Sequence, residues 1–362
     1  MVAVTGGGTG GHIFPNVAVI EELKRRGVTD MCWIGDRHGK EAEWAAALGI
    51  SYYGVRTGKL RRYFSLQNLV DTFGVFIGIV QSFCILRRLK PAVLFSKGGF
   101  VSVPPVIASR LLHIPVVTHE SDIHPGMATR IIARTATVIC VSFEQAGGFL
   151  EGKSVSYTGN PVRAIIHSAD RKRGERFLDF TEKLPVVTVL GGSQGASSLN
   201  RAVWELLREG DPPFNLVHQF GGGNPLETTG ESARYRHFEF IGEEMGDVLA
   251  ASDLIVSRAG AGALYEIGCV GKPSILIPLP RSKSRGEQID NARHFEDHEA
   301  ARIIEDELLN GKILLEVIGK LLADDRLLRK MGENATKLCK THAEREIAEI
   351  ILSVGGMKAR TG

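Results

Sequence analysis

The feature that most constrains the fold of this chain is a regular alternation of short apolar runs with stretches of helical periodicity. In the first half, the runs are VAVTG, MCWIG, SYYGV, AVLFS, PVVTH and TVICV, and the predicted helices between and after them are 11–26, 39–47, 65–90, 102–112, 125–134 and 143–149. In the second half, the rhythm continues through VVTVL, FNLVHQF, HFEFI, DLIVS, PSILIP and AARII. Such alternation is typical of a parallel sheet covered on both faces by helices. The sequence therefore predicts an α/β protein with two Rossmann-like, doubly wound domains.

The boundary between the two domains is predicted at TGNPVR, residues 158–163, because an Asn-Pro step disfavours helix at Asn160. The predicted domains are residues 1–161 and 162–340. After about residue 324 the pattern is purely helical, and we expect the segment 341–362 to return to the N-terminal domain.

Composition excludes several classes of protein. A length of 362 residues suits about two ordinary domains. With 44 Lys and Arg against 41 Asp and Glu, the net charge of +3 is too small for a nucleic-acid binder. The five cysteines are scattered without a C-x-x-C pair, which favours a reduced, cytosolic compartment. The start, MVAVTGGG, is not a signal peptide, and the uncharged segment 72–86 is too short to span a membrane.

Two glycine-rich turns follow the first strand of each half: GGGTGGH at residues 6–12 and GGSQGA at residues 191–196. Glycine allows close approach to a ligand, and the helix that follows offers free N–H groups and the positive end of its dipole. Each turn is a candidate anion cradle. Because ligands of open α/β sheets bind beyond the carboxyl ends of the strands, we expect both turns to face one central cleft.

A dinucleotide site is the main alternative for the first turn. Gly6, Gly8 and Gly11 fit G-x-G-x-x-G, and Asp36 ends the second strand where such proteins carry a ribose-binding acid. This pattern would suit an NAD-dependent oxidoreductase. His12 argues against it, since a cofactor-phosphate turn needs no imidazole, and the second glycine turn argues further against it.

Other polar residues are predicted to line the cleft. HESD, residues 119–122, ends a strand, and its Glu120 could serve as a general base, whereas Asp122 could equally be a helix cap. In the second half, Arg258 could neutralise a phosphate and Glu266 could accept the hydroxyls of a ribose.

The motifs GGGTGGHIFPNVAV, SKGGFVSVPP, HESDIHPG, TGNPVR, GGSQGASSLN and SRAGAGALYEIGCVGKP, in this order, closely resemble the MurG family. The resemblance runs from residue 2 to about residue 345. Members of this family are bacterial enzymes that transfer N-acetylglucosamine from UDP-N-acetylglucosamine to undecaprenyl-pyrophosphoryl-N-acetylmuramyl-pentapeptide (lipid I), which gives lipid II for peptidoglycan. The resemblance implies a GT-B fold, a lipid-acceptor N-terminal domain, a nucleotide-sugar C-terminal domain and an inverting transfer.

The resemblance also implies roles for single residues. Ile241 would read the uracil through its backbone, Glu266 would hold the ribose and Gln288 would contact the sugar. The full set of predicted substrate-binding residues is Thr9, Gly10, Gly11, Asp122, Arg163, Ser193, Asn200, Ile241, Arg258, Ala261, Gly262, Ala263, Leu264, Tyr265, Glu266 and Gln288. Two positions depart from the family pattern: Asp122 stands where Asn is common, and Phe100 stands where Tyr is common. An ionised Asp122 can accept but not donate hydrogen bonds.

For the proposed reaction, a base must take the proton of the acceptor's C4 hydroxyl. His12 is the first candidate, since an unperturbed imidazole titrates near neutrality, and Glu120 and Asp122 are the others. The chain has no Asp-x-Asp pair that would chelate a metal at a diphosphate, so neither a metal nor a cofactor is predicted.

A membrane-bound acceptor predicts a membrane-contact surface on the N-terminal domain. Between residues 56 and 134 there are eleven Lys and Arg residues against three Asp and Glu. In the helix 65–90, one apolar stripe, with Leu69, Phe73, Phe76, Val80 and Phe83, is predicted to face the core. A second stripe, beside the cations of the same helix, is predicted to contact the membrane: Val75, Ile79, Leu86, Arg87 and Arg88. The alternative is a helix buried on both faces.

These expectations place the protein peripherally on the cytoplasmic face of the bacterial inner membrane, with proteins of cell-wall synthesis and division as further partners. Besides the oxidoreductase, two other functions compete: a UDP-sugar epimerase on the same scaffold and a non-catalytic protein that binds the membrane surface.

Overall fold

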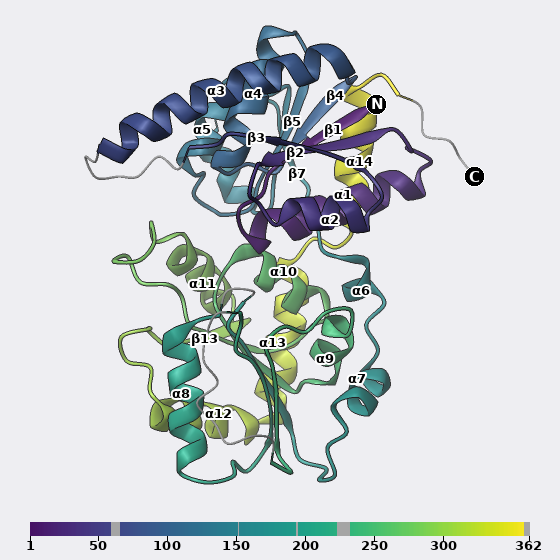
Figure 1. Cartoon of the computed structure of the whole chain (residues 1–362). Coiled ribbons are helices and arrows are strands. Elements are labelled where there is room, and N and C mark those ends of the chain that lie inside the picture. The colour runs from purple at the N-terminus through teal and green to yellow at the C-terminus, as the bar shows by residue number, and fades with distance from the viewer. Residues whose placement is uncertain (59–65, 151, 193–194, 223–231, 358–362) are drawn as a thin grey trace. The chain divides into compact units, whose positions relative to one another are not determined.

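The computed structural model describes residues 1–58, 66–150, 152–192, 195–222 and 232–357, with the side chains of the helix at Leu66 described from Gly74 onward. The chain divides into two compact units (Figure 1). Unit 1 comprises Met1–Arg163 together with His342–Gly362, and unit 2 comprises Ala164–Thr341.

Unit 1 is built on a seven-stranded parallel sheet with the order β3-β2-β1-β4-β5-β6-β7. The strands are β1 (Val2–Thr5), β2 (Met31–Asp36), β3 (Ser51–Val55), β4 (Val93–Ser96), β5 (Val116–Glu120), β6 (Val138–Val141) and β7 (Val155–Tyr157). Strand order reverses at β1, so the chain winds outward in both directions from the middle of the sheet. The carboxyl ends of β1 and β4 therefore lie beside each other, which is where ligands of such sheets bind.

Helices cover both faces of this sheet (Figure 1). One face carries α1 (Gly10–Arg25), α2 (Glu41–Ala47) and α14 (Ala343–Val354), and the other carries α3 (Leu66–Leu89), α4 (Val103–Leu111) and α5 (Met127–Ala133). The 3-10 turns are η1 (Phe100–Ser102) and η2 (Glu144–Phe149). Alternation along β1 divides the core: Val2 and Val4 pack with α1 and α14, whereas Ala3 packs with α3 and α4. The last helix of the chain is therefore part of the core of unit 1.

Unit 2 has a six-stranded parallel sheet with the order β10-β9-β8-β11-β12-β13. The strands are β8 (Val186–Leu190), β9 (Asn215–Gln219), β10 (Tyr235–Phe238), β11 (Leu254–Ser257), β12 (Ser274–Leu276) and β13 (Ala301–Ile303). The prediction of two doubly wound parallel sheets is confirmed. The predicted strand HFEFI, residues 237–241, begins two residues later and ends three residues later than β10. At its predicted end, the backbone N–H of Ile241 donates to the side chain of Gln219 and not to a neighbouring strand.

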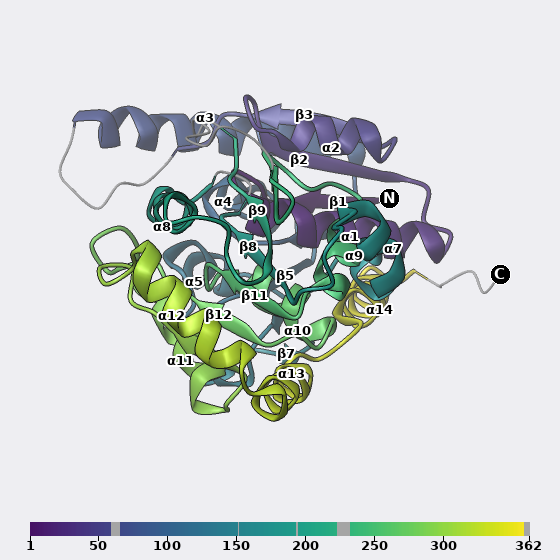
Figure 2. The ribbon, with the colours of Figure 1, turned by 90° about the horizontal axis from the view of Figure 1, so that it is seen from below.

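The helices of unit 2 also lie on both sides of its sheet. They are α6 (Ala164–His167), α7 (Arg171–Leu178), α8 (Ser197–Arg208), α9 (Met245–Ala251), α10 (Ala261–Cys269), α11 (Glu287–Asp297), α12 (Gly311–Leu322) and α13 (Asp325–Leu338). Figure 2 shows α8 and α12 on one side of the strands and α9 and α10 on the other. Leu199 and Val203 of α8 pack with Leu314 of α12 in one buried cluster.

Helix α3 presents a different face to the solvent from the one predicted. Phe76 and Val80, predicted to be core residues, are 63% and 49% exposed, whereas Leu86, a predicted membrane contact, is completely buried with Ala3 and Ile34. The prediction for Leu86 is therefore wrong. The two apolar stripes were equivalent by periodicity, and packing against the sheet and α4 selects which one is buried. Leu69 and Phe73 lie outside the described side chains.

Among the described residues, no helix combines the length and the apolar character needed to cross a membrane.

Candidate functional site

The first glycine turn joins β1 to α1, and the carboxylate of Glu41 lies inside it. The backbone has positive φ at Gly6 (+130°) and Gly8 (+84°), and the N–H of Gly8 donates to Glu41 Oε1 at 3.2 Å. A Cβ built at Gly7 would lie 1.7 Å from the same oxygen. Glu41 therefore fills the inner side of the turn at Gly7 and Gly8, and the predicted anion cradle, residues 6–12, stays a prediction for its outer residues. The turn is exposed at Gly8 and Thr9, beside the first N–H groups of α1.

Asp36, the ribose-binding acid of the dinucleotide alternative, is also engaged within unit 1. Its Oδ1 accepts the backbone N–H of His38 at 2.8 Å, and its Oδ2 accepts the hydroxyl of Thr57. Together with the Glu41 carboxylate in the glycine turn, these bonds leave the two features of a dinucleotide site already occupied by the chain.

His12 lies in the first turn of α1, against the glycine turn that follows β4. A Cβ built at Gly99 would lie 3.0 Å from His12 Nε2, and Gly99 has a φ of +76°. The ring of Phe100 lies against Gly8, at 3.3 Å from the position of a Cβ there. Because a side chain at position 99 would displace the imidazole, the two turns form one surface at the carboxyl ends of β1 and β4. His12 is half-buried in this surface.

Glu120 has a structural role. It is 6% exposed, and its two oxygens accept the backbone N–H groups of Asp122 (3.0 Å) and Gly126 (3.2 Å). Both oxygens are used to shape the loop between β5 and α5, so the structure does not support the prediction that Glu120 takes a proton from substrate. Asp122 is half-exposed on the same loop.

Lys97 is a residue of this site that the sequence reasoning missed. It follows β4 directly, is completely buried, and donates to the hydroxyl of Ser121. The hydroxyl of Ser121 in turn donates to Asn160 Oδ1 at 3.0 Å. Burial lowers the pKa of Lys97 to about 8, although Glu120 and Asp122 act in the opposite direction. The sequence did contain a signal for it: Lys97 stands between an apolar strand and two glycines. Because two glycines predict a tight turn, a residue directly before them is expected at the carboxyl end of the strand, where ligands bind.

His119 completes the buried polar network behind these turns. Its Nε2 lies 2.9 Å from the carbonyl oxygen of Gly159, and burial and the nearby Lys97 hold its pKa well below the ordinary value. The network links the ends of β4 and β5 to Asn160, at the start of the segment that leaves unit 1.

Arg163, at the end of unit 1, is 8% exposed and lies over the ring of Phe14, with 4.6 Å between guanidinium carbon and ring centroid. The cation packs on the aromatic face, which stabilises this conformation. Its predicted contact with substrate stays a prediction.

In unit 2, the second glycine turn leads into α8, but Ser193 lies outside the described residues. Asn200, a predicted substrate ligand, is completely buried. Its amide donates to the carbonyl of Phe220 at 2.9 Å, and its Oδ1 lies 3.0 Å from His218 Nε2. The prediction for Asn200 is therefore wrong: a buried amide must satisfy its hydrogen bonds, and here it does so within unit 2.

Arg258 follows β11 and is held by Asp306. Its guanidinium donates to Asp306 Oδ1 and to the hydroxyl of Ser198, at 2.7 Å each, and Ser198 also donates to Asp306. Burial disfavours the charge of Asp306, but the bonds from Ser198 and Arg258 prevail and lower its pKa. Because Ser198 is in the first turn of α8, this cluster fixes the helix N-terminus that follows the second glycine turn. The structure gives Arg258 a structural contact, and its predicted contact with a phosphate or a sugar oxygen stays a prediction.

The predicted nucleotide segment divides into two kinds of residue. Leu264 and Tyr265 are completely buried, so only their backbone is available for the predicted contact with substrate. Gly262, Ala263 and Glu266 are half-exposed in the first two turns of α10, and Ala261 begins this helix. Their exposure is compatible with a ligand at this helix N-terminus.

The two remaining donor-side residues are partly engaged. The N–H of Ile241 is held by Gln219 Oε1 at 2.8 Å, so only its carbonyl could take part in base recognition. Gln288 is half-exposed in the first turn of α11, and its Oε1 accepts the N–H of Leu279 at 3.2 Å, so its amide N–H groups are the atoms suited to a sugar.

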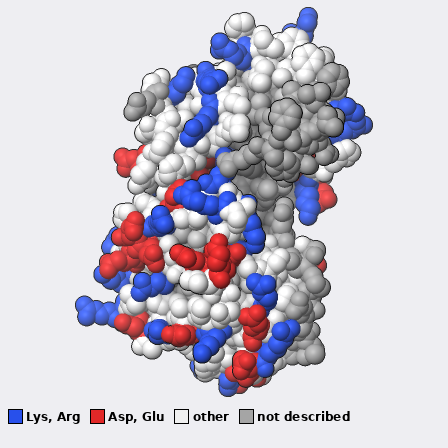
Figure 3. Space-filling view, turned by 90° about the vertical axis from the view of Figure 1, so that its left-hand side faces the viewer, with Lys and Arg blue, Asp and Glu red and all other residues white. Residues whose placement is uncertain are grey.

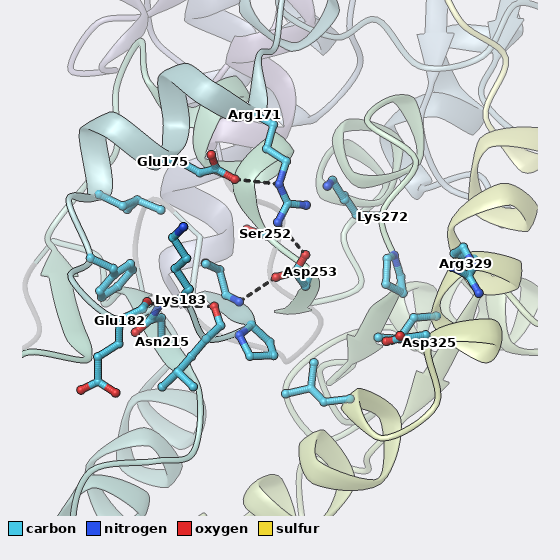
Figure 4. Close-up of a pocket in the computed structure, with 18 of the residues that line it drawn as sticks. Arg171, Glu175, Glu182, Lys183, Asn215, Ser252, Asp253, Lys272, Asp325 and Arg329 are labelled. Atoms are coloured by element: carbon cyan, nitrogen blue, oxygen red, sulfur yellow. Dashed lines mark hydrogen bonds and ion pairs between the residues drawn. The ribbon is translucent and has the colours of Figure 1, made fainter.

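A pocket of about 840 Å³ lies at the amino ends of the unit 2 strands, opposite the carboxyl ends where the glycine turns lie (Figure 4). Its lining includes Val186, Asn215 and Pro273, which are at the amino ends of strands. Within it, Arg171 bonds Glu175 at 2.8 Å and Asp253 at 2.9 Å, so these charges compensate each other. The pocket is thus remote from the strand ends where the glycine turns lie.

Comparisons with known proteins agree with the motif order. Residues 2–141 match the glycosyltransferase family 28 N-terminal domain, and residues 186–350 match its C-terminal domain. A UDP-N-acetylglucosamine--N-acetylmuramyl-(pentapeptide) pyrophosphoryl-undecaprenol N-acetylglucosamine transferase from Treponema pallidum is 47% identical over 331 residues, 88% of this chain and 86% of the relative. A Bacillus cereus transferase of the same name, numbered 2, is 42% identical over 91% of this chain and 93% of the relative.

Among solved structures, the crystal structure of Acinetobacter baumannii MurG matches with a TM-score of 0.74 and 25% identity, over 97% of this chain and 99% of that one. The agreement extends over both units, with the two domain types in the same order. The chain belongs to glycosyltransferase family 28 and, within it, to the family of UDP-N-acetylglucosamine--N-acetylmuramyl-(pentapeptide) pyrophosphoryl-undecaprenol N-acetylglucosamine transferases, the MurG family.

Proposed function

We propose that this chain is an inverting glycosyltransferase that moves N-acetylglucosamine from UDP-N-acetylglucosamine to the C4 hydroxyl of undecaprenyl-pyrophosphoryl-N-acetylmuramyl-pentapeptide. The product is lipid II, the precursor of peptidoglycan. The observation that carries the proposal is 47% identity, over most of both chains, to a transferase whose name states this donor and this acceptor.

Unit 2 is the proposed donor domain. The N-termini of α8 and α10 follow β8 and β11, which are neighbours in the sheet. Their unpaired N–H groups and dipoles suit the diphosphate, Glu266 suits the ribose hydroxyls and the Gln288 amide suits the sugar. Arg258 contributes indirectly, by holding Ser198 and thereby α8 in position.

Unit 1 is the proposed acceptor domain, and His12 is the proposed base. The acceptor oxygen attacks C1 of the donor sugar as the bond from C1 to the UDP oxygen breaks, and the proton of the hydroxyl passes to the imidazole. The half-buried position of His12 in the first turn of α1, with Nε2 beside Gly99 at the carboxyl ends of β1 and β4, supports this role. Asp122, on the next loop, is the second candidate.

Membrane contact by unit 1 is part of the proposal, with the protein peripheral on the cytoplasmic face of the inner membrane. The outward face of α3 carries Phe76 and Val80, with exposed Arg87 and Arg88 near its end. Val75 and Ile79 are half-buried beside this stripe. In Figure 3, the charged side chains visible on unit 1 are mostly Lys and Arg. Apolar side chains next to cations suit an anionic lipid surface. Contacts with proteins of cell-wall synthesis and division rest on the family resemblance alone.

The test of the transferase is product formation from labelled UDP-N-acetylglucosamine and a short-chain lipid I analogue. His12→Ala should lower kcat by about 100-fold or more, the usual range for loss of a general base, and leave UDP binding unchanged. The matched control is His38→Ala, which alters an exposed histidine of the same unit. Wild-type turnover in His12→Ala would remove His12 from this role.

Two further readouts separate the alternatives. UDP and UDP-N-acetylglucosamine should raise the melting temperature, and NAD and NADH should leave it unchanged. Conversion of the donor in the absence of any lipid acceptor would indicate an epimerase in place of the transferase.

A further inference from the structure

Glu41 is a buried carboxylate that enters the first glycine turn from a neighbouring element of unit 1. The residue begins α2, is completely buried, and reaches across to the turn that joins β1 to α1. Its Oε1 accepts the N–H of Gly8 at 3.2 Å and lies 3.5 Å from the N–H donor of Asp36. Burial raises the pKa of Glu41, because the charged carboxylate is removed from solvent.

The space for this carboxylate is made by two glycines. A Cβ at Gly7 would lie 1.7 Å from Glu41 Oε1, and a Cβ at Gly39 would lie 2.0 Å from Glu41 Oε2. No side chain larger than hydrogen fits at either position while the carboxylate is present. Within the described part of the chain, Oε2 has no hydrogen-bond partner, so the carboxylate is not held by a compensating cation there.

Gly8 is fixed between Glu41 on one side and Phe100 on the other. The next residues are Thr9, which caps α1, and then Gly10, Gly11 and His12 in its first turn. The path of the backbone through Gly8 therefore determines where the exposed N–H groups of α1 and the His12 ring are placed. An anion that binds the inner N–H of the turn stabilises this path.

We propose that Glu41 is a positioning and specificity residue: its carboxylate occupies the inner half of the first glycine turn as a built-in anion, which holds Thr9–His12 outward for substrate and excludes a dinucleotide phosphate from Gly6–Gly8. The consequence for catalysis rests on the proposed transferase function. The binding of an anion inside the glycine turn can be tested whether or not the protein is a transferase.

The first test is steady-state kinetics of Glu41→Ala. The expected result is a fall in kcat on the order of 100-fold, as for other displacements of about 1 Å at a catalytic group, with the KM for UDP-N-acetylglucosamine unchanged. Formate, which has the size of the removed carboxylate, should restore kcat in Glu41→Ala. Glu43→Ala, an exposed glutamate of the same helix, is the matched control and should behave as wild type with or without formate.

The second test needs no activity. Formate should raise the melting temperature of Glu41→Ala in a saturable manner and leave that of the wild type and of Glu43→Ala unchanged. If the wild type transfers no sugar, the proposed function fails, and this measurement still decides the role of Glu41.

Two results would overturn the proposal: Glu41→Ala with wild-type kcat, or Glu41→Ala that has lost activity and responds to formate in neither assay. If Glu41→Ala does not fold, Glu41→Gln decides. Its amide oxygen can still accept the Gly8 N–H, so we expect a folded enzyme with kcat within about tenfold of wild type, since the turn keeps its geometry. A Gln variant that melts like the wild type and is inactive would contradict the positioning role.

Discussion

Removal of Asp306 should destabilise unit 2 strongly, because it leaves a buried guanidinium without its counter-charge. Asp306 and Arg258 have side chains that are only 6% and 12% exposed, and their atoms lie 2.7 Å apart. Breaking a buried ion pair from one side costs about 3–5 kcal/mol. Arg258 would keep its bonds to the carbonyl of Ile277 (3.0 Å) and to Ser198, so we expect the lower end, about 3 kcal/mol.

For a unit of this size, each kcal/mol lowers the melting temperature by about 2–4 °C, so Asp306→Ala should melt about 6–12 °C below the wild type. The assay is urea and thermal unfolding of the full chain at pH 7. Glu316→Ala is the control, since it breaks only the exposed ion pair with Lys320 and should leave the free energy of unfolding nearly unchanged. The double variant Asp306→Ala, Arg258→Met removes the unpaired charge as well, and should be more stable than Asp306→Ala alone.

The effect should depend on pH in one direction. Because the folded pKa of Asp306 is lowered from 3.8, its contribution is complete above that value and is lost as the pH falls through the lower, folded pKa. The difference between wild type and Asp306→Ala should therefore shrink in acid. A loss below about 1 kcal/mol at pH 7, or a double variant no more stable than Asp306→Ala, would refute the reasoning.

Two further predictions concern unit 1. Because Leu86 is buried, Leu86→Ala should lower the free energy of unfolding in urea by about 2–5 kcal/mol and leave sedimentation with anionic vesicles unchanged. Phe76→Ser, on the exposed face, should weaken vesicle binding and leave the free energy of unfolding unchanged. The reverse pattern would contradict the assignment of the two faces of α3. The pKa of Lys97 is lowered from 10.5 to about 8, so between these two pH values the unfolded state binds the proton more tightly and the free energy of unfolding should rise with pH. Lys97→Met should remove this dependence on pH. An identical dependence in both proteins would show that another group causes it.

Local sequence was enough to predict the sheets and the turns. The apolar runs VAVTG and DLIVS form β1 and β11, because strands that are apolar on both faces are buried from water only between two layers of helices. The glycines after β1 mark a real turn, with positive φ at Gly6 and Gly8, since this conformation disfavours any other residue. His12 was predicted as a site residue from its place in the first turn of a helix after a strand, and its position beside Gly99 suits that role.

The predictions that failed concern which partner a side chain meets. Periodicity places Leu86 and Phe76 on different faces of α3 but does not say which face the sheet covers. The amide of Asn200 and the carboxylate of Glu120 suit a ligand by type, yet both satisfy their hydrogen bonds within the protein.

Sequence by itself determined the two doubly wound sheets, the glycine turns and the family of this protein, because these depend on local periodicity and on motif order. Only the tertiary structure decided that Glu41 enters the first glycine turn, that Lys97 is buried at the glycine turn after β4, and that Asp306 holds Arg258. These partners are distant in the chain, and a buried charge or amide binds whichever group the packing of the sheets brings within reach, since leaving it unpaired costs several kcal/mol.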